Sequence, residues 1–271
     1  MEHRTVTTLR EWFADYVGTF QSGNPEDQQN IELKKAHTRR VCMEILEIGN
    51  SLGLNDEDLC LAEVMALFHD IGRFDQYARY GTFSDLKSED HAMLGVTVLR
   101  KTGVLEVLDR SSAELILRAI GYHNKAFLPK DESERCLFFS RLLRDADKLD
   151  ILRVVTDYYR RQPGDRNGAI ELELPDTPEI SMEVYEDLLA KRIVKTEHLK
   201  TLNDFKLLQM GWVFDVNFCR TFELIRERRY MEMIRNALPW SEKISKIYFT
   251  VRSYLKEHCG DSSQTTALRK T

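Results

Sequence analysis

The stretch ALFHDIGR, residues 66–73, is an apolar run that ends in an adjacent histidine and carboxylate. Helical spacing places His69 on the buried stripe of a predicted helix, together with Leu59, Ala62 and Ala66. A neutral imidazole beside a carboxylate at a buried helix end is unfavourable unless both groups find partners. A divalent metal ion accepts nitrogen and oxygen donors together. The alternative is a histidine bonded to a core carbonyl next to a solvated aspartate, and other parts of the chain decide between the two.

The composition is typical of a soluble globular protein. The chain has 271 residues, of which 42% are hydrophobic and 31% charged, enough for one large domain with or without a helical annex. The formal net charge of -5 argues against an extended nucleic-acid surface. No apolar run approaches the roughly 18–20 residues that a membrane span needs, so we expect no membrane partner.

The N-terminus and the cysteines predict a cytoplasmic location. Residues 1–4 lead into a mixed polar segment without the apolar core of a signal peptide. The 5 cysteines are scattered, and none forms a CxxC pair. We therefore expect reduced thiols rather than a disulfide framework or a zinc knuckle.

Apolar residues recur at helical spacing along most of the chain, whereas strand-like alternation is almost absent. The predicted helices cover about residues 5–21, 28–52, 56–70, 89–102, 111–123 and 133–161, and two to four more lie within 181–257. The pattern predicts an all-α fold.

Helix ends and irregular segments follow from capping residues and from glycine and proline. Asn55 is the expected N-cap of the helix that carries His69, Ser88 caps the next one, and the helix after that starts at Ser111 or Ser112. Residues 71–87 contain two glycines and are expected to form a loop. Residues 162–178 are expected to form a loop or a short hairpin.

Five predicted helices carry a metal-competent side chain on the face that points at the core. A single buried histidine is usually satisfied by a core hydrogen bond, but many buried imidazoles and carboxylates are hard to satisfy pairwise. A shared ion or ion pair satisfies them together. These side chains are His37, His69 with Asp70, His91, His123 and Asp147.

The order of these residues resembles the ligand pattern of the HD-domain metal-dependent phosphohydrolase superfamily. The segment FHDIGR resembles its His-Asp-x-Gly-Lys stretch, with Arg73 where a lysine is common. The segment DADKLD resembles the one that supplies the last ligand, which points to Asp147. His91 in SEDHAMLG and His123 in GYHNK match the two further histidines of the dinuclear branches. The adjacent second histidine and the Gly-Tyr-Pro signature of the HD-GYP cyclic-di-GMP phosphodiesterases are missing from this sequence.

The resemblance covers roughly residues 30–160 and implies an HD-domain helical bundle with additional C-terminal helices. We expect an N-terminal helix over residues 1–27 that packs on the core, and an HD metal-binding core over 28–161. A helical C-terminal extension of the same domain is expected over 162–259, followed by a flexible tail over 260–271.

The resemblance also implies a site for two divalent metal ions, with Mn, Fe, Co, Zn or Mg as the candidate elements. Asp70 would bridge the two ions. One coordination sphere would be completed by His37, His69 and Asp147, and the other by His91 and His123.

The implied reaction is attack on a phosphomonoester or phosphodiester by a metal-activated hydroxide. Asp70 is then catalytic as the bridging ligand. Arg73 and Lys148 are the candidate cations for the charge that develops on the phosphoryl oxygens.

Two alternatives remain open at this stage. A smaller branch of the superfamily, resembling myo-inositol oxygenase, uses the same ligand order to hold two irons and activate dioxygen, so a di-iron oxygenase is the enzymatic alternative. A nucleotide-binding or sensor module without turnover is the other. The expected partners are a small phosphorylated, nucleotide-like substrate and, through the aromatic-rich C-terminal helices, a second copy of the chain in a homodimer.

Overall fold

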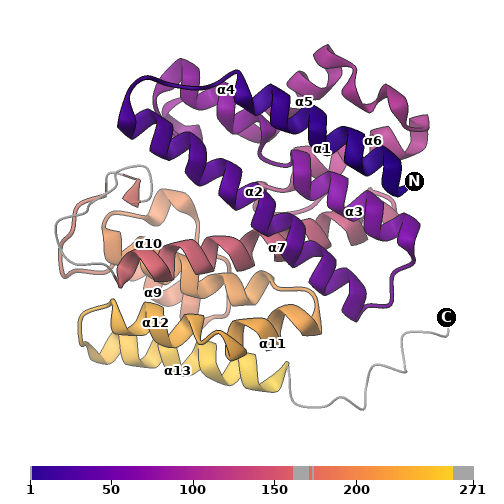
Figure 1. The fold of residues 1–271 in the computed structure, drawn as a ribbon. Helices are drawn as coiled ribbons and strands as arrows, with labels where there is room; N and C mark the ends of the chain where they lie inside the picture. The colour runs from indigo at the N-terminus through magenta and orange to yellow at the C-terminus, as the bar shows by residue number, and fades with distance from the viewer. Residues whose placement is uncertain (1, 161–170, 173, 259–271) are drawn as a thin grey trace. The chain divides into compact units, whose positions relative to one another are not determined.

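The computed structural model of the chain describes residues 2–160, 171–172 and 174–258. Within these ranges every regular element is a helix (Figure 1), which confirms the predicted all-α fold. No described helix combines the length and the apolar character of a membrane span. The predicted tail over 260–271 and the stretch 162–170 lie outside the described residues.

The chain divides into two compact units, Met1–Ile151 and Leu152–Thr271. The boundary falls inside α7 (Glu134–Tyr159), so one helix begins in the first unit and ends in the second. The predicted boundary at residue 161, and the assignment of the C-terminal helices to the same domain, remain predictions.

The first unit is built around α3 (Asp56–Phe68), which is buried at every residue from Cys60 to Phe68. Three helices pack against it: α1 (His3–Gly18), α2 (Pro25–Ser51) and α6 (Arg110–Tyr122). Next to them, α4 (Ile71–Tyr80) packs on α5 (His91–Thr102), and α5 packs on α6. Two short 3-10 helices complete the unit, η1 (Asp85–Lys87) and η2 (Val104–Val107).

Aspartates cap α5 and α6, so the predicted caps Ser88 and Ser111 or Ser112 are wrong. Asp90 accepts hydrogen bonds from the first backbone N–H groups of α5, and Asp109 accepts one from α6. A carboxylate fits this position because it satisfies free N–H groups and also complements the positive end of the helix dipole.

The predicted loop over residues 71–87 is wrong in its first part, because Ile71–Tyr80 form α4. Of the two glycines that suggested a loop, Gly72 lies within α4 and Gly81 ends it. A Cβ atom on Gly72 would overlap the carbonyl oxygen of His91 and lie 2.5 Å from the backbone nitrogen of Gly95, so α4 and α5 touch at this point. Gly81 ends α4 in the left-handed region, with φ of 63°.

The second unit contains five described α-helices after α7, so the prediction of two to four is wrong. α11 (Cys219–Glu227) and α12 (Tyr230–Asn236) are separated by a break at Arg229, which has a left-handed φ of 57° and no glycine or proline to mark it. The other elements are α9 (Met182–Leu189), η3 (Thr196–His198), α10 (Leu202–Gly211), η4 (Trp212–Asp215) and α13 (Glu242–Glu257).

Candidate metal centre

The six predicted metal ligands meet in one cluster of the first unit. Each of them offers a nitrogen or oxygen atom within 4.8 Å of the corresponding atoms of at least two others. They come from α2 (His37), the junction of α3 and α4 (His69 and Asp70), the start of α5 (His91), the end of α6 (His123) and the middle of α7 (Asp147). All are buried except Asp147, whose side chain is 17% exposed.

Asp70 occupies the N-cap position of α4, directly after His69 at the C-cap of α3. An aspartate at an N-cap usually accepts a hydrogen bond from its own helix, but the Asp70 carboxylate makes none. Its charged partners are side chains of α2 and α4 rather than backbone N–H groups of α4. The Lys34 ammonium donates to Oδ2 at 2.8 Å, and Nε of Arg73 lies 3.5 Å from Oδ1.

Four donor atoms form what we call the first donor group: Nε2 of His37, Nε2 of His69, Oδ1 of Asp147 and Oδ2 of Asp70. The His37 nitrogen lies 3.2 Å from that of His69, 3.2 Å from the Asp147 oxygen and 3.5 Å from the Asp70 oxygen. The His69 nitrogen lies 3.6 Å and 3.8 Å from the same two oxygens. Donors bound to one ion at about 2.0–2.2 Å are separated by about 3.0–3.6 Å, so the spacing suits a single ion.

The second donor group consists of Nε2 of His91, Nε2 of His123 and Oδ1 of Asp70. The two nitrogens lie 3.0 Å apart, and they lie 3.4 Å and 3.8 Å from the Asp70 oxygen. The two carboxylate oxygens of Asp70 are therefore divided between the two donor groups.

Two of the imidazoles have their protonation fixed by the backbone. Nδ1 of His69 lies 2.8 Å from the carbonyl oxygen of Ala66, and Nδ1 of His123 lies 2.7 Å from that of Ile120. Because a carbonyl oxygen only accepts hydrogen bonds, each Nδ1 carries a proton, which leaves Nε2 as the ring atom that can bind an ion.

Carboxylates orient the other two imidazoles. Nδ1 of His37 lies 2.7 Å from Oδ2 of Asp150, and Nδ1 of His91 lies 2.7 Å from Oδ2 of Asp85. Hydrogen bonds of this kind, from the ring nitrogen that does not face the ion, are typical of metal-binding histidines. Asp150 is itself paired with Arg40.

The cluster fits divalent ions because its Nε2 atoms face one another in pairs, so that each pair needs a positive charge between its members. The Nε2 atoms of His37 and His69 are 3.2 Å apart, and those of His91 and His123 are 3.0 Å apart. Two lone pairs at this distance repel unless a proton or a cation lies between them. Nitrogen and carboxylate donors together suit Mn, Fe, Co or Zn.

The carboxylates of the cluster are ionised at neutral pH. Burial favours the neutral form of Asp70, but Lys34 and His69 outweigh it and hold the pKa of that carboxyl well below its usual range. For Asp147, burial is likewise outweighed by hydrogen bonds from His37 and His69, which keep its pKa well below the usual range. The site can therefore accept cations without first losing carboxyl protons.

One histidine of each donor group, His37 and His91, has a shifted pKa, and the two shifts are in opposite directions. Burial lowers the pKa of His37, but hydrogen bonds to Asp147 and Asp150 outweigh it and raise the pKa to about 9. Burial, and then the positive charge of Arg73, lower the pKa of His91 to about 3 despite its hydrogen bond to Asp85.

Two of the residues predicted to be catalytic lie beside the ligands. The Arg73 guanidinium donates to Oδ1 of Asp85 and to Oε1 of Gln76 at 2.9 Å each, and also to the carbonyl oxygen of Phe83. It therefore braces the carboxylate that orients His91. Lys148 is buried on α7 next to the ligand candidate Asp147. A direct catalytic role for either cation remains a prediction.

Sequence reasoning missed Lys34, Asp85 and the role of Asp150. Lys34 precedes His37 by one helical turn, so the spacing on α2 could have placed it beside the cluster. The sequence carries no comparable signal for Asp85, because its contact with His91 depends on how the segment between α4 and α5 folds back.

Residues 35–152 match the family model of the HD domain. The chain contains an HD domain. The matched range includes both donor groups, and HD domains are typical of metal-dependent phosphohydrolases. No significant match to this chain was found among curated proteins or among solved structures. The assignment of individual ligands and catalytic groups remains a prediction.

Proposed function

We propose that this HD domain binds two divalent metal ions and hydrolyses a small phosphomonoester or phosphodiester, such as a nucleotide. The observation that supports the proposal is the placement of Asp70. One of its oxygens belongs to the first donor group and the other to the second. A carboxylate placed in this way can join two ions, which is the arrangement that suits in-line displacement at phosphorus.

Ions bound there would lower the pKa of water toward neutrality and polarise the phosphoryl group of the substrate. The protein prepares the site for them. Backbone carbonyls and carboxylates fix the imidazoles with Nε2 inward, and Asp70 and Asp147 keep their charge at neutral pH. Lys34 and Arg73 place positive charge next to Asp70, where it would favour the developing negative charge of a phosphoryl group.

The first test is metal analysis of the full-length chain, purified without chelator, combined with hydrolysis assays. We expect close to two ions per chain and metal-dependent release of phosphate or nitrophenol from p-nitrophenyl phosphate, bis(p-nitrophenyl) phosphate or nucleotides. Asp70→Ala should lose both ions and abolish turnover while the helical circular dichroism spectrum is kept. Asp15→Ala, which removes an exposed carboxylate from α1, is the matched control and should behave like the wild type.

Three results would contradict the proposal. Turnover that survives complete removal of metal would exclude the metal-dependent mechanism. Iron-dependent oxygen uptake without phosphoester cleavage would favour the di-iron oxygenase, which has the same ligand order. Tight nucleotide binding without turnover would favour the sensor. The homodimer stays a prediction, which light scattering of the full-length chain would test.

A further inference from the structure

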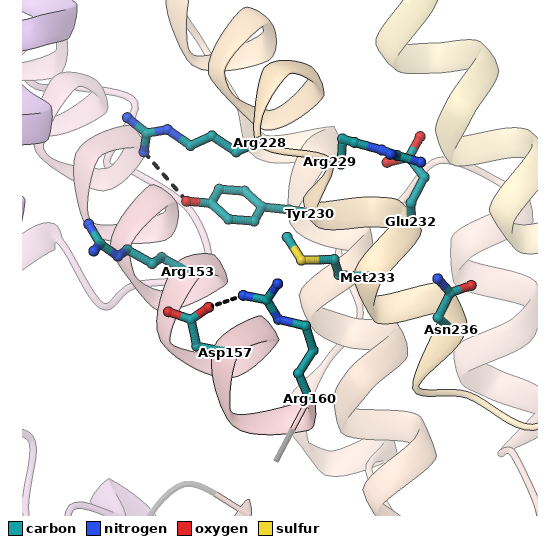
Figure 2. Close-up of a pocket in the computed structure, with 9 residues that line it drawn as sticks. All are labelled: Arg153, Asp157, Arg160, Arg228, Arg229, Tyr230, Glu232, Met233 and Asn236. Atoms are coloured by element: carbon teal, nitrogen blue, oxygen red, sulfur yellow. Dashed lines mark hydrogen bonds and ion pairs between the residues drawn. The ribbon is translucent and has the colours of Figure 1, made fainter.

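The second unit contains a pocket of about 580 Å³ that does not include any of the six predicted metal ligands (Figure 2). It is formed by the last turns of α7 and the residue after them, by the segment that joins α11 to α12, and by α12 itself. Four arginines and two carboxylates are among the residues that line it, which gives the lining a formal charge of +2 (four positive less two negative). The lining residues are Arg153, Asp157, Arg160, Arg228, Arg229, Tyr230, Glu232, Met233 and Asn236.

Two of these arginines lie at the end of α7, Arg153 in its last turns and Arg160 directly after its last residue, Tyr159. Arg153, Asp157 and Arg160 are spaced four and three residues apart, so they line the same side of the helix. Oδ1 of Asp157 accepts a hydrogen bond from Arg160 at 2.6 Å. Within the described part of the chain, the exposed Arg153 guanidinium has no ion pair, so its charge is not neutralised by the protein.

The junction of α11 and α12 supplies the other two arginines. Arg229 has φ of 57° and ψ of 34°, a left-handed conformation that is uncommon outside glycine. Arg228 donates to the hydroxyl of Tyr230 at 3.5 Å, and Figure 2 shows the Arg153 side chain extending on the same side of the pocket. Among the described residues, the exposed Arg229 side chain likewise makes no ion pair.

Guanidinium groups gathered from two separate segments on one hollow repel each other unless an anion lies between them. Their planar, forked donors match the oxygens of a phosphate group in two-point hydrogen bonds. The gathering is notable in a chain whose formal net charge is -5. The pocket is also larger than one phosphate group needs, and it lies within the size range of small-molecule sites.

We propose that this pocket is a binding site for a small, soluble phosphorylated molecule with at least two negative charges. Arg153 and Arg229 supply the unneutralised charges, one from each side of the pocket. Because none of the lining residues belongs to either donor group, the site is separate from the HD metal cluster and would bind its ligand without cleaving it.

Calorimetric titration of the full-length chain, as purified, tests the proposal. The probes are methylenediphosphonate, a pyrophosphate analogue that resists hydrolysis, and inorganic tripolyphosphate and ATP. Because each charge-assisted contact is worth at least about tenfold in affinity, Arg153→Ala with Arg229→Ala should weaken one class of sites by about 100-fold or more. Arg252→Ala removes an exposed arginine of α13 that does not line the pocket, and it should leave binding unchanged.

Further readouts separate this site from the metal cluster. The double variant should keep wild-type metal content, wild-type phosphoesterase activity if the HD domain has it, and wild-type thermal stability, because both side chains are exposed. The Arg153→Lys variant should bind the probes with intermediate affinity, since lysine keeps the positive charge but lacks the two parallel N–H donors of a guanidinium group.

Two outcomes would overturn the proposal: no binding of any probe to the wild type, or the same binding by the wild type and the double variant. Stronger binding of ATP than of tripolyphosphate would support a nucleotide ligand, and equal binding would support recognition of the phosphates alone. Neither outcome depends on the phosphohydrolase assay, so the two proposals can fail separately.

Discussion

The two donor groups of the metal cluster share one carboxylate but differ in composition. The first contains two histidines, Asp147 and one Asp70 oxygen, whereas the second contains two histidines and only the other Asp70 oxygen. More donors and a second carboxylate favour tighter binding of a divalent cation. In the proposed two-metal site, the first group would therefore hold an ion more tightly than the second.

The charged neighbours of the two donor groups also differ. His37 lies between two carboxylates, which raise its pKa above that of an ordinary histidine even though it is buried. His91 is buried next to Arg73, and its pKa is depressed. Two imidazoles with the same task in the proposed site thus differ in their affinity for a proton, because their charged neighbours differ.

Replacing one histidine in each group gives the largest expected effect. After a brief exposure to a chelator, His91→Ala should keep close to one ion per chain in the four-donor first group, whereas His69→Ala should keep fewer, because both of its groups then have only three donors. Hydrolysis should fall by more than about 100-fold in both variants, since each disrupts a metal site directly. Elemental analysis and phosphoesterase assays check this. Equal metal loss in the two variants would contradict the ranking.

Gly72→Ala tests whether the second group depends on the contact between α4 and α5. The added methyl group meets backbone atoms of His91 and Gly95, which cannot move independently of α5. Overpacking of this kind destabilises proteins by about 1–3 kcal/mol. We expect that loss in denaturant unfolding, together with weaker binding of the second ion. Gly18→Ala, which meets no atom within 4 Å, is the control. A wild-type stability for Gly72→Ala would argue against this contact.

The carboxylates behind the histidines allow a finer comparison. Asp150→Asn removes a charge behind the first group, and Asp85→Asn removes one behind the second. Loss of such an orienting partner typically weakens metal binding by about 10–100-fold. In competition with a chelator, each substitution should weaken the binding of one ion and leave the binding of the other unchanged. If each substitution weakened the binding of both ions equally, the two donor groups would not be independent.

The pH dependence of the metal-free protein tests the same comparison without any ion. The pKa of His37 rises from 6.5 in the unfolded chain to about 9, so its stabilisation is present below pH 6.5 and is lost as the pH rises through 9. The pKa of His91 falls to about 3, so stability is lost as the pH falls from 6.5 toward 3. Thermal unfolding in a chelator should therefore show a maximum near pH 6.5. A flat profile between pH 6.5 and 9 would contradict the state assigned to His37.

Helical spacing predicted which residues face inward, and the order of histidines and aspartates along the chain pointed to the cluster. The cap of α3 at Asn55 was also predictable, since it depends on local backbone geometry. The helix α4 was not, because Gly72 is needed for its contact with His91 and Gly95, which lie far from it in the sequence. Asp85 and Lys34 act through contacts between elements, which no local pattern records.

The position of Asp70 at the junction of two helices has a consequence for folding itself. Ions held by the two donor groups would cross-link segments spread from α2 to α7, and an unfolded chain could not bind them in the same way. Metal uptake is then linked to folding, so that the free metal concentration adds to the stability of an already folded first unit. Scarcity of metal would therefore lower the stability of the protein as well as the rate of any metal-dependent reaction.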